Sequence, residues 1–319
     1  MPELPEVETV RDGLARFVLD RVIQDVEVLR DYSVRRQEGG PAGLERDLLG
    51  RRFTGAARRG KFLWLPLSGG AASDSAVPDR PRALLAHLGM SGQLLVHRPE
   101  AGAGAAGSEG PHVRVRLRLG PDHDPLLLSF VDQRTFGHLA TVDLVPTPDG
   151  LPGGRGADLL LVPAPAAHIA RDPLDPAFDE DAVVARVRRR RTGIKRALLD
   201  QTLVSGVGNI YADEALWRAR THFARATDTM PARQVREVLR SATAVMSEAL
   251  VAGGTSFDAL YVDVNGSSGY FERSLHAYGR EGESCDRCGT LIVREQFMNR
   301  SSHFCPVCQR KPRLGAVVR

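Results

Sequence analysis

The first three residues, Met1, Pro2 and Glu3, place two chemically active groups side by side. Removal of Met1 would give Pro2 a free secondary amine, which is a nucleophile towards sugar and carbonyl carbons. The neighbouring carboxylate of Glu3 can supply or accept protons. A Schiff base on a secondary amine has no N–H to lose, so its iminium stays charged and withdraws electrons. Taken alone, however, a proline after an initiating methionine is most often without chemical meaning.

Four cysteines form a second constellation near the carboxyl end. Cys285 and Cys288 are separated by sixteen residues from Cys305 and Cys308, which is the C-x2-C…C-x2-C spacing of zinc sites. The alternatives are two disulfides or four free thiols, and a reducing cytosol disfavours stable disulfides. Because protein thiolates would fill all four tetrahedral positions, the spacing predicts one structural Zn²⁺ per chain rather than a catalytic metal.

Basic residues are concentrated in one stretch, although the chain carries only 43 Lys+Arg against 39 Asp+Glu. Residues 186–200 contain one acidic residue, Asp200, and seven basic residues, which are Arg186, Arg188, Arg189, Arg190, Arg191, Lys195 and Arg196. Such a run suits a polyanion, and a solvated helix face is the alternative. No apolar run is long enough to span a membrane, so no membrane association is expected.

A glycine-rich turn follows the basic run. Gly206 and Gly208 lie between two expected helices, 192–199 and 210–218. Backbone N–H groups at a helix start are free to bind phosphate, and Asn209 adds side-chain donors. An ordinary connection between helices is the alternative.

The first ten residues, from Met1 to Val10, resemble the amino terminus of the formamidopyrimidine-DNA glycosylases. These enzymes use the proline to excise oxidised purines from DNA. Their relatives, the endonuclease VIII-like enzymes, usually begin Met-Pro-Glu-Gly-Pro, so Leu4 favours the formamidopyrimidine branch. The resemblance extends in order over nearly the whole chain, except for two Gly/Ala-rich loops, at 68–82 and 100–111, and the tail after Cys308.

Two segments resemble the parts of the family that fill the hole left by a flipped base. Met90 lies in the first, at 87–93, and a soft unbranched side chain suits an irregular gap. In the second, at 132–137, Arg134 aligns with the residue that contacts the orphaned cytosine, and Phe136 with the wedge. Core packing is the alternative for the two apolar residues. The family commonly has Pro-Arg-Arg at 133–135, where this chain has Gln-Arg-Thr.

The resemblance also implies a set of DNA contacts. Lys61, His87 and Asn209 match phosphate contacts, and His112 and Arg190 match further DNA-contacting positions. Arg300 aligns with the finger arginine that holds the damaged nucleotide's phosphate and assists the last elimination. Lys195 matches a recurring lysine without an assigned role. Residues 255–278 resemble the loop that closes over the extruded base, without individual contacts.

Periodicity predicts the elements that must position these groups. Pro5 can open a helix in which Val7, Val10, Leu14 and Phe17 recur at helical spacing. Strands are expected at 22–29, 53–67, 83–96, 112–119, 126–131 and 138–145. In the stretch 112–119 apolar and basic residues alternate, so one face is expected to be buried and the other exposed.

The expected fold is therefore a multidomain α+β protein. We expect an N-terminal catalytic β-sandwich with an N-terminal helix at 1–145 and a linker at 146–176. A helix–two-turn–helix DNA-binding domain would follow at 177–278, and a β-hairpin zinc finger with a tail at 279–319.

The sequence thus predicts a bifunctional DNA glycosylase and AP lyase for oxidised purines, with Pro2, Glu3, Lys61 and Arg300 as catalytic residues. Its partner would be damaged double-stranded DNA, and it would work as a monomer in the bacterial cytoplasm, at the nucleoid. Two alternatives remain: an endonuclease VIII-like glycosylase for oxidised pyrimidines, and a non-catalytic DNA-binding protein of the same fold. The second would be expected to lose Pro2, Glu3 or Lys61, and all three are present.

Overall fold

The computed structural model describes residues 2–69, 80–99, 110–253, 264 and 274–312. Most of the two Gly/Ala-rich loops, most of the expected base-covering loop and the end of the tail lie outside the described residues. The chain forms two compact units, Met1–Ala167 with Gly253–Gly269, and His168–Ala252 with Tyr270–Arg319.

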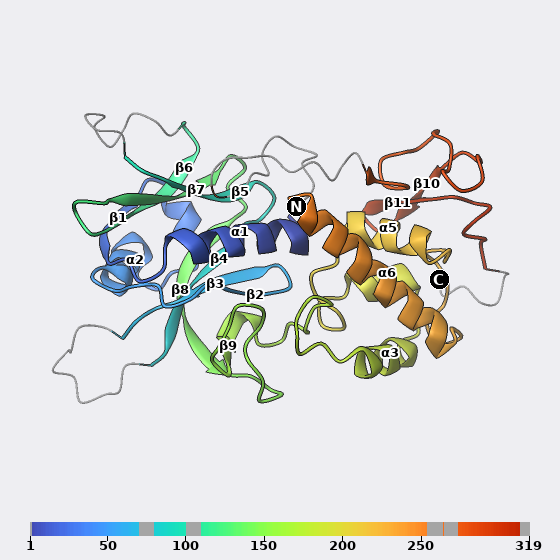
Figure 1. The fold of residues 1–319 in the computed structure, drawn as a ribbon, viewed down its shortest axis with the longest axis horizontal. Helices are drawn as coiled ribbons and strands as arrows, with labels where there is room; N and C mark the ends of the chain where they lie inside the picture. Colours follow the sequence, from blue (N-terminus) through green and yellow to red (C-terminus); the bar gives the residue numbers. More distant parts are fainter. Residues whose placement is uncertain (1, 70–79, 100–109, 254–263, 265–273, 313–319) are drawn as a thin grey trace. The chain divides into compact units, whose positions relative to one another are not determined.

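Two antiparallel sheets form the first unit (Figure 1). The four-stranded sheet has the order β1 (Ile23–Val28), β6 (Val113–Leu119), β7 (Leu126–Asp132) and β5 (Gly92–His97). The five-stranded sheet has the order β2 (Ala57–Arg59), β3 (Phe62–Pro66), β4 (Arg82–His87), β8 (His138–Pro146) and β9 (Leu161–Pro163). The expected sandwich is confirmed, with a core built from both sheets.

Strand β6 shows the expected alternation. Val113, Val115, Leu117 and Leu119 are buried at 0–7% exposure. On the opposite face the arginines meet acceptors, as when Arg116 pairs with Glu27 on β1. The basic face is therefore partly neutralised within its own sheet.

Two of the expected strands are each divided in two. Gly60, at φ +57°, turns the chain between β2 and β3, and Gly89, at φ +65°, lies between β4 and β5. A left-handed backbone costs glycine little. The second break transfers the chain from the five-stranded to the four-stranded sheet, so the segment at 88–91 is a connection between sheets.

Helix α1 (Leu4–Phe17) contacts β2 and β3 of one sheet and β5 of the other. Val7, Val10 and Leu14 are at most 5% exposed, whereas Phe17 is 40% exposed. The apolar stripe therefore anchors the helix up to its last turn. Shorter elements complete the unit: η1 (Asp31–Val34), α2 (Gly40–Leu48) and η2 (Ala164–Ala166).

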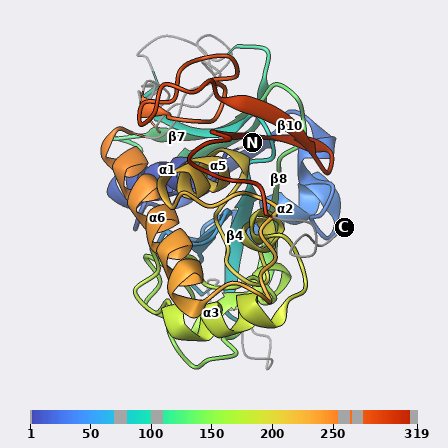
Figure 2. The same cartoon turned by 90° about the vertical axis from the view of Figure 1, so that its right-hand side faces the viewer.

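The second unit is helical, with one β-hairpin. Its elements are α3 (Glu180–Arg189), α4 (Ile194–Leu199), α5 (Asn209–Arg218), α6 (Ala232–Val251), β10 (Val293–Phe297) and β11 (Arg300–Phe304). The long helix α6 packs against α3 and α5 (Figure 2). Among the described residues, no helix combines the length and the hydropathy needed to cross a bilayer.

Candidate active site and nucleic-acid interface

Pro2 and Glu3 are buried at the start of α1, and Glu3 is 4% exposed. The Glu3 N–H donates to Oε2 of Glu6 at 2.8 Å, one half of a capping box. This contact fixes the backbone of the residue that follows the candidate nucleophile. Burial also keeps the Glu3 carboxylate out of bulk water, beside the residue whose amine would react.

An ion pair ties this helix to the turn that carries Lys61. Arg58, fully buried on β2, donates through Nε to Oε2 of Glu8 on α1 at 2.8 Å. Its Nη1 donates to the carbonyl oxygen of Gly60 at 3.1 Å. Burial acts to raise the pKa of Glu8, but Arg58 and Arg11 outweigh it and lower the pKa. One guanidinium therefore holds both the helix of Pro2 and the half-buried turn of Lys61.

His87 lies at the end of β4 and is a neutral hydrogen-bond donor near neutral pH. Its pKa is lowered from 6.5 by burial, and further by the charges of Arg36, Arg35 and Lys61. Its Nδ1 accepts the N–H of Gly89 at 3.2 Å, which leaves the proton of the neutral ring on Nε2. Together with Lys61, this donor suits a phosphate.

The two expected plug segments are in direct contact. A Cβ on Gly89 would lie 2.5 Å from the Gly137 nitrogen and 2.7 Å from the Phe136 carbonyl carbon, so glycine is required there. Met90 is 39% exposed, Phe136 is 54% exposed, and the Arg134 side chain is also exposed. Core packing requires burial, so the exposure supports the plug interpretation for Met90 and Phe136.

His112 is hydrogen-bonded through its backbone to the first residue of the second plug segment, Asp132. Its carbonyl oxygen accepts the N–H of Asp132 at 2.9 Å, and its side chain is half-buried. The first unit thus brings His112 to the base of the segment that carries Arg134.

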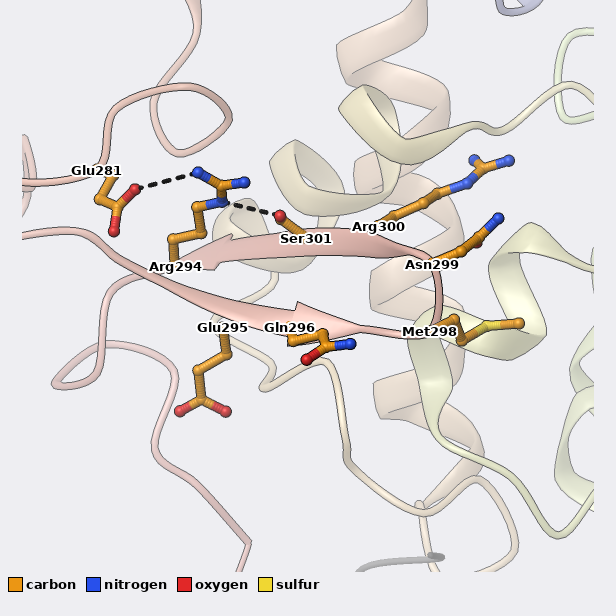
Figure 3. A pocket seen from close by; sticks show the side chains of 8 residues that line it. All are labelled: Glu281, Arg294, Glu295, Gln296, Met298, Asn299, Arg300 and Ser301. Atoms are coloured by element: carbon orange, nitrogen blue, oxygen red, sulfur yellow. Dashed lines mark hydrogen bonds and ion pairs between the residues drawn. The ribbon is translucent and has the colours of Figure 1, made fainter.

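In the second unit, the start of α5 and the hairpin come together. The side-chain amide of Asn209 donates to the carbonyl oxygen of Ser301 at 3.2 Å, directly after Arg300. Figure 3 shows the side chains of Arg300 and Asn299 extending from the hairpin turn, at an open pocket of about 670 Å³. Arg294, by contrast, donates to the Ser301 hydroxyl. The structure therefore ties Asn209 to the residue next to Arg300, and both were expected to contact DNA.

Lys195, which was counted in the basic run at 186–200, is not exposed to a polyanion. Its side chain is fully buried, and Nζ lies 2.7 Å from Oδ1 of Asp213. The same Nζ donates to the Ser301 carbonyl and the Ser302 hydroxyl, both at 2.9 Å. Asp213 also accepts the N–H of His303 at 3.0 Å. A buried charge needs such partners, and here they fix the hairpin strand that begins at Arg300.

Arg190 ends α3 as its C-cap and remains exposed. Its side chain is 54% exposed and lies 3.8 Å from a carboxylate oxygen of Asp200. The guanidinium therefore stays open to a phosphate, while its carbonyl is held by the Thr227 hydroxyl.

The four cysteines converge as the sequence predicts. The sulfur atoms of Cys285, Cys288, Cys305 and Cys308 all lie within 4.8 Å of one another. Hydrogen bonds from Thr290 lower the pKa of Cys288 to about 6, whereas burial and the neighbouring cysteines raise the pKa of Cys308 to about 12. Four thiolates this close repel one another, and a divalent cation removes the conflict. The donor set fits one structural zinc ion.

Family comparisons agree with this geometry over almost the whole chain. The N-terminal domain of formamidopyrimidine-DNA glycosylase matches residues 1–139, and its H2TH domain matches residues 169–259. The zinc finger found in FPG and IleRS matches residues 282–310. The chain belongs to the formamidopyrimidine-DNA glycosylase family. Four cysteines within this finger, and the family match itself, establish zinc as its metal.

Relatives of the same family name are similar over their full length. The formamidopyrimidine-DNA glycosylase of a Nocardioides species is 58% identical over 98% of this chain and 96% of its own. That of Leifsonia xyli is 53% identical over 97% of this chain and 100% of its own.

Solved structures of the family are similar too. Lactococcus lactis Fpg with DNA containing an abasic site has a TM-score of 0.75 and 30% identity. MutM with DNA containing carbocyclic 8-oxo-G has a TM-score of 0.75 and 29% identity. Both comparisons cover 97% of this chain and all of the other.

One supporting residue of the helical unit had no local sequence signal. Glu214 on α5 accepts the backbone N–H groups of His276, Ala277 and Tyr278 at 2.8–3.0 Å. Burial raises the pKa of Glu214 against the effect of these bonds. Its partners lie more than sixty residues away, so only the fold brings them together.

The departure from the family pattern at 133–135 has a structural outcome. Thr135, where the family commonly has arginine, adopts φ +56°, a rare conformation for a β-branched residue.

His303 on β11 supports the zinc finger from one side. It is 8% exposed and packs edge-on against Tyr278 with ring centroids 5.0 Å apart.

Proposed function

We propose that this chain carries out base excision repair of oxidised purines, such as 8-oxoguanine and formamidopyrimidines, in duplex DNA. It acts as both N-glycosylase and AP lyase. The observation that carries the proposal is the buried Pro2–Glu3 start of α1, in a chain that matches the family along its length. Solved family members bind DNA with an abasic site and with Fapy-dG.

Pro2 acts as the nucleophile once Met1 is removed. Its amine attacks C1′ of the damaged nucleotide and the C1′–N bond to the base breaks. The C1′–O4′ bond of the sugar then opens, O4′ takes up a proton, and Pro2 is left joined to C1′ as an iminium, with Glu3 transferring the protons. The resulting iminium acidifies C2′, so β-elimination breaks the 3′ C–O bond. δ-Elimination then breaks the 5′ C–O bond, assisted by Arg300 at the phosphate.

The remaining site residues hold the deformed duplex. Lys61 and His87 supply donors for phosphates of the damaged strand, and His112, Arg190 and Asn209 extend this grip. Met90, Arg134 and Phe136 occupy the gap left by the flipped nucleotide. Refilling that gap offsets an extrusion cost of a few kcal/mol.

Zinc has a structural role in this proposal. It is bound by the four cysteines and stabilises a segment too short to bury a core of its own. The buried Lys195–Asp213 pair holds the same hairpin from the helical side. The zinc site and the buried ion pair therefore both fix the position of Arg300. We further propose that the enzyme works as a monomer, in the bacterial cytoplasm at the nucleoid.

The proposal is tested by offering duplexes that contain either 8-oxoguanine or an oxidised pyrimidine, with borohydride added to trap a Schiff base. Faster cutting and trapping on 8-oxoguanine supports it. A preference for the pyrimidine would favour an endonuclease VIII-like enzyme, and binding without cutting would favour a non-catalytic protein.

A further inference from the structure

We infer that Asp132 is the positioning residue that fixes both plug segments in one arrangement. The inference rests on the proposed roles of Arg134 and Phe136 in filling the gap. Asp132 ends β7, directly before these residues, and its side chain is fully buried. It is therefore shielded from any DNA phosphate and acts through its neighbours.

Three donors converge on the Asp132 carboxylate. The Ser91 hydroxyl donates to Oδ1 at 2.6 Å, and the Arg134 N–H to the same oxygen at 3.2 Å. The Gly137 N–H donates to Oδ2 at 2.7 Å. Ser91 follows Met90, whereas Arg134 and Gly137 flank Phe136. One carboxylate thus links the segment of Met90 to the segment of Arg134 and Phe136.

The backbone carbonyls of the second segment, at 136 and 137, are held by the guanidinium of Arg35. Arg35 donates from Nη1 to the Gly137 carbonyl at 2.8 Å and from Nη2 to the Phe136 carbonyl at 2.9 Å. Asp132 takes the N–H groups of this segment, and Arg35 takes its carbonyls. Charge-assisted bonds of this kind are stronger than neutral ones. They hold Thr135 in its left-handed conformation and keep Phe136 exposed.

Replacement of the Asp132 carboxylate by an amide removes its charge and one of its two acceptor oxygens, while the size of the side chain stays the same. In Asp132→Asn one acceptor oxygen becomes a donor. Either the Gly137 N–H loses Oδ2, or Ser91 and Arg134 lose Oδ1, in which case the Arg134 N–H keeps the Ser91 hydroxyl at 3.0 Å. We expect excision opposite cytosine to slow about tenfold, the effect of one lost hydrogen bond to a charged group. Because Arg134 reads the orphaned cytosine, excision opposite adenine should slow less, and cutting of a pre-formed abasic site least.

The matched control is Asp47→Asn. Asp47 is also a buried carboxylate of the first unit, and it accepts hydrogen bonds from Thr141 and Gln37. Within the part of the chain that the structure describes, none of its hydrogen bonds or ion pairs reaches either plug segment. Asp47→Asn should therefore leave the ratio of excision opposite cytosine to excision opposite adenine unchanged, even if it lowers the melting temperature. A double variant, Asp132→Asn with Arg134→Ala, should lower the cytosine-to-adenine excision ratio no further than Arg134→Ala alone. If the two substitutions lowered this ratio independently, so that their effects multiplied in the double variant, the inference would be overturned.

Hydrogen exchange in the free protein gives a readout that does not depend on DNA. Asp132→Asn should speed exchange at the N–H of residue 137 or of residue 134, whichever loses its carboxylate oxygen, whereas Asp47→Asn should speed neither. Unchanged exchange would refute the positioning role. If Arg134→Ala itself leaves the opposite-base ratio intact, the proposed role of Arg134 fails, and exchange alone decides whether Asp132 orders the segment.

Discussion

The imidazole rings of His87 and His138 are stacked, with centroids 5.2 Å apart and planes inclined by 17°. The two residues are direct partners in the pairing of β4 with β8. Burial lowers the pKa of His138 to about 3, and the charges of His87, Arg36 and Arg35 act in the same direction. His87, which we propose to contact a phosphate, is therefore stacked on a second ring that stays neutral.

This stack predicts a loss of stability in mild acid. Between pH 6.5 and about 3 the unfolded chain binds a proton at His138 that the folded chain does not, so stability falls as the pH falls through this range. At pH 5 this effect lowers the free energy of unfolding by about 2 kcal/mol relative to pH 7, which corresponds to a melting temperature lower by roughly 4–8 °C. His138→Phe keeps the ring contact without titration, so its melting temperature should fall less from pH 7 to pH 5.

The exposed His123 supplies the control for this comparison. His123→Gln should follow the pH dependence of the parent protein. Parallel curves for the parent and His138→Phe would show that the stacked pair does not control acid stability.

Glu3→Gln should spare lesion binding but remove most base excision. The size of the side chain is kept, while its charge and its ability to transfer protons are lost. General acid–base assistance is worth about 10²–10⁴ in rate. Single-turnover excision on 8-oxoguanine duplexes, with binding measured in parallel, checks this. A rate within a fewfold of the parent would assign the proton transfer to another group.

Purified protein should contain about one zinc per chain, because one tetrahedral site is present. Cys288→Ser should reduce metal content, DNA binding and strand cutting together, since the hairpin that carries Arg300 loses its anchor. Arg300→Ala is the control: it should slow the final elimination while keeping the metal. Full activity in zinc-free protein would contradict a structural role for the ion.

Phe136→Ala should slow extrusion of the damaged base and leave cutting of a pre-formed abasic site less affected. The side chain is 54% exposed, so its removal should change the melting temperature little. Both cleavage rates and the melting temperature are measured on the same variant. Equal loss of both activities with a marked drop in melting temperature would instead assign Phe136 to packing.

Sequence patterns were sufficient to predict those features that depend on residues close together in the sequence. The spacing of the cysteines predicted the zinc site, and the alternation on 112–119 predicted the buried face of β6. The breaks at Gly60 and Gly89 were not anticipated. Gly89 has the apolar residues Leu88 and Met90 on either side, and the charged residues around Gly60 were included in one continuous strand at 53–67. A continuous apolar pattern does not show where a chain leaves one sheet for another.

The supporting contacts could not be predicted for a related reason. Lys195 follows a dense basic run, and only its distant partners, such as Ser301, show that it is buried. Asp132 likewise gains its role from Ser91, which is 41 residues away in sequence. Long-range pairing of this kind depends on the fold and leaves no local signature.

The measurement that tests the central claim most directly is the site of covalent attachment to DNA. Borohydride reduction during reaction with an 8-oxoguanine duplex should give a stable protein–DNA adduct, and peptide mapping should place it on Pro2. An undamaged duplex should give none. An adduct on Lys61 or on any other lysine would contradict the account.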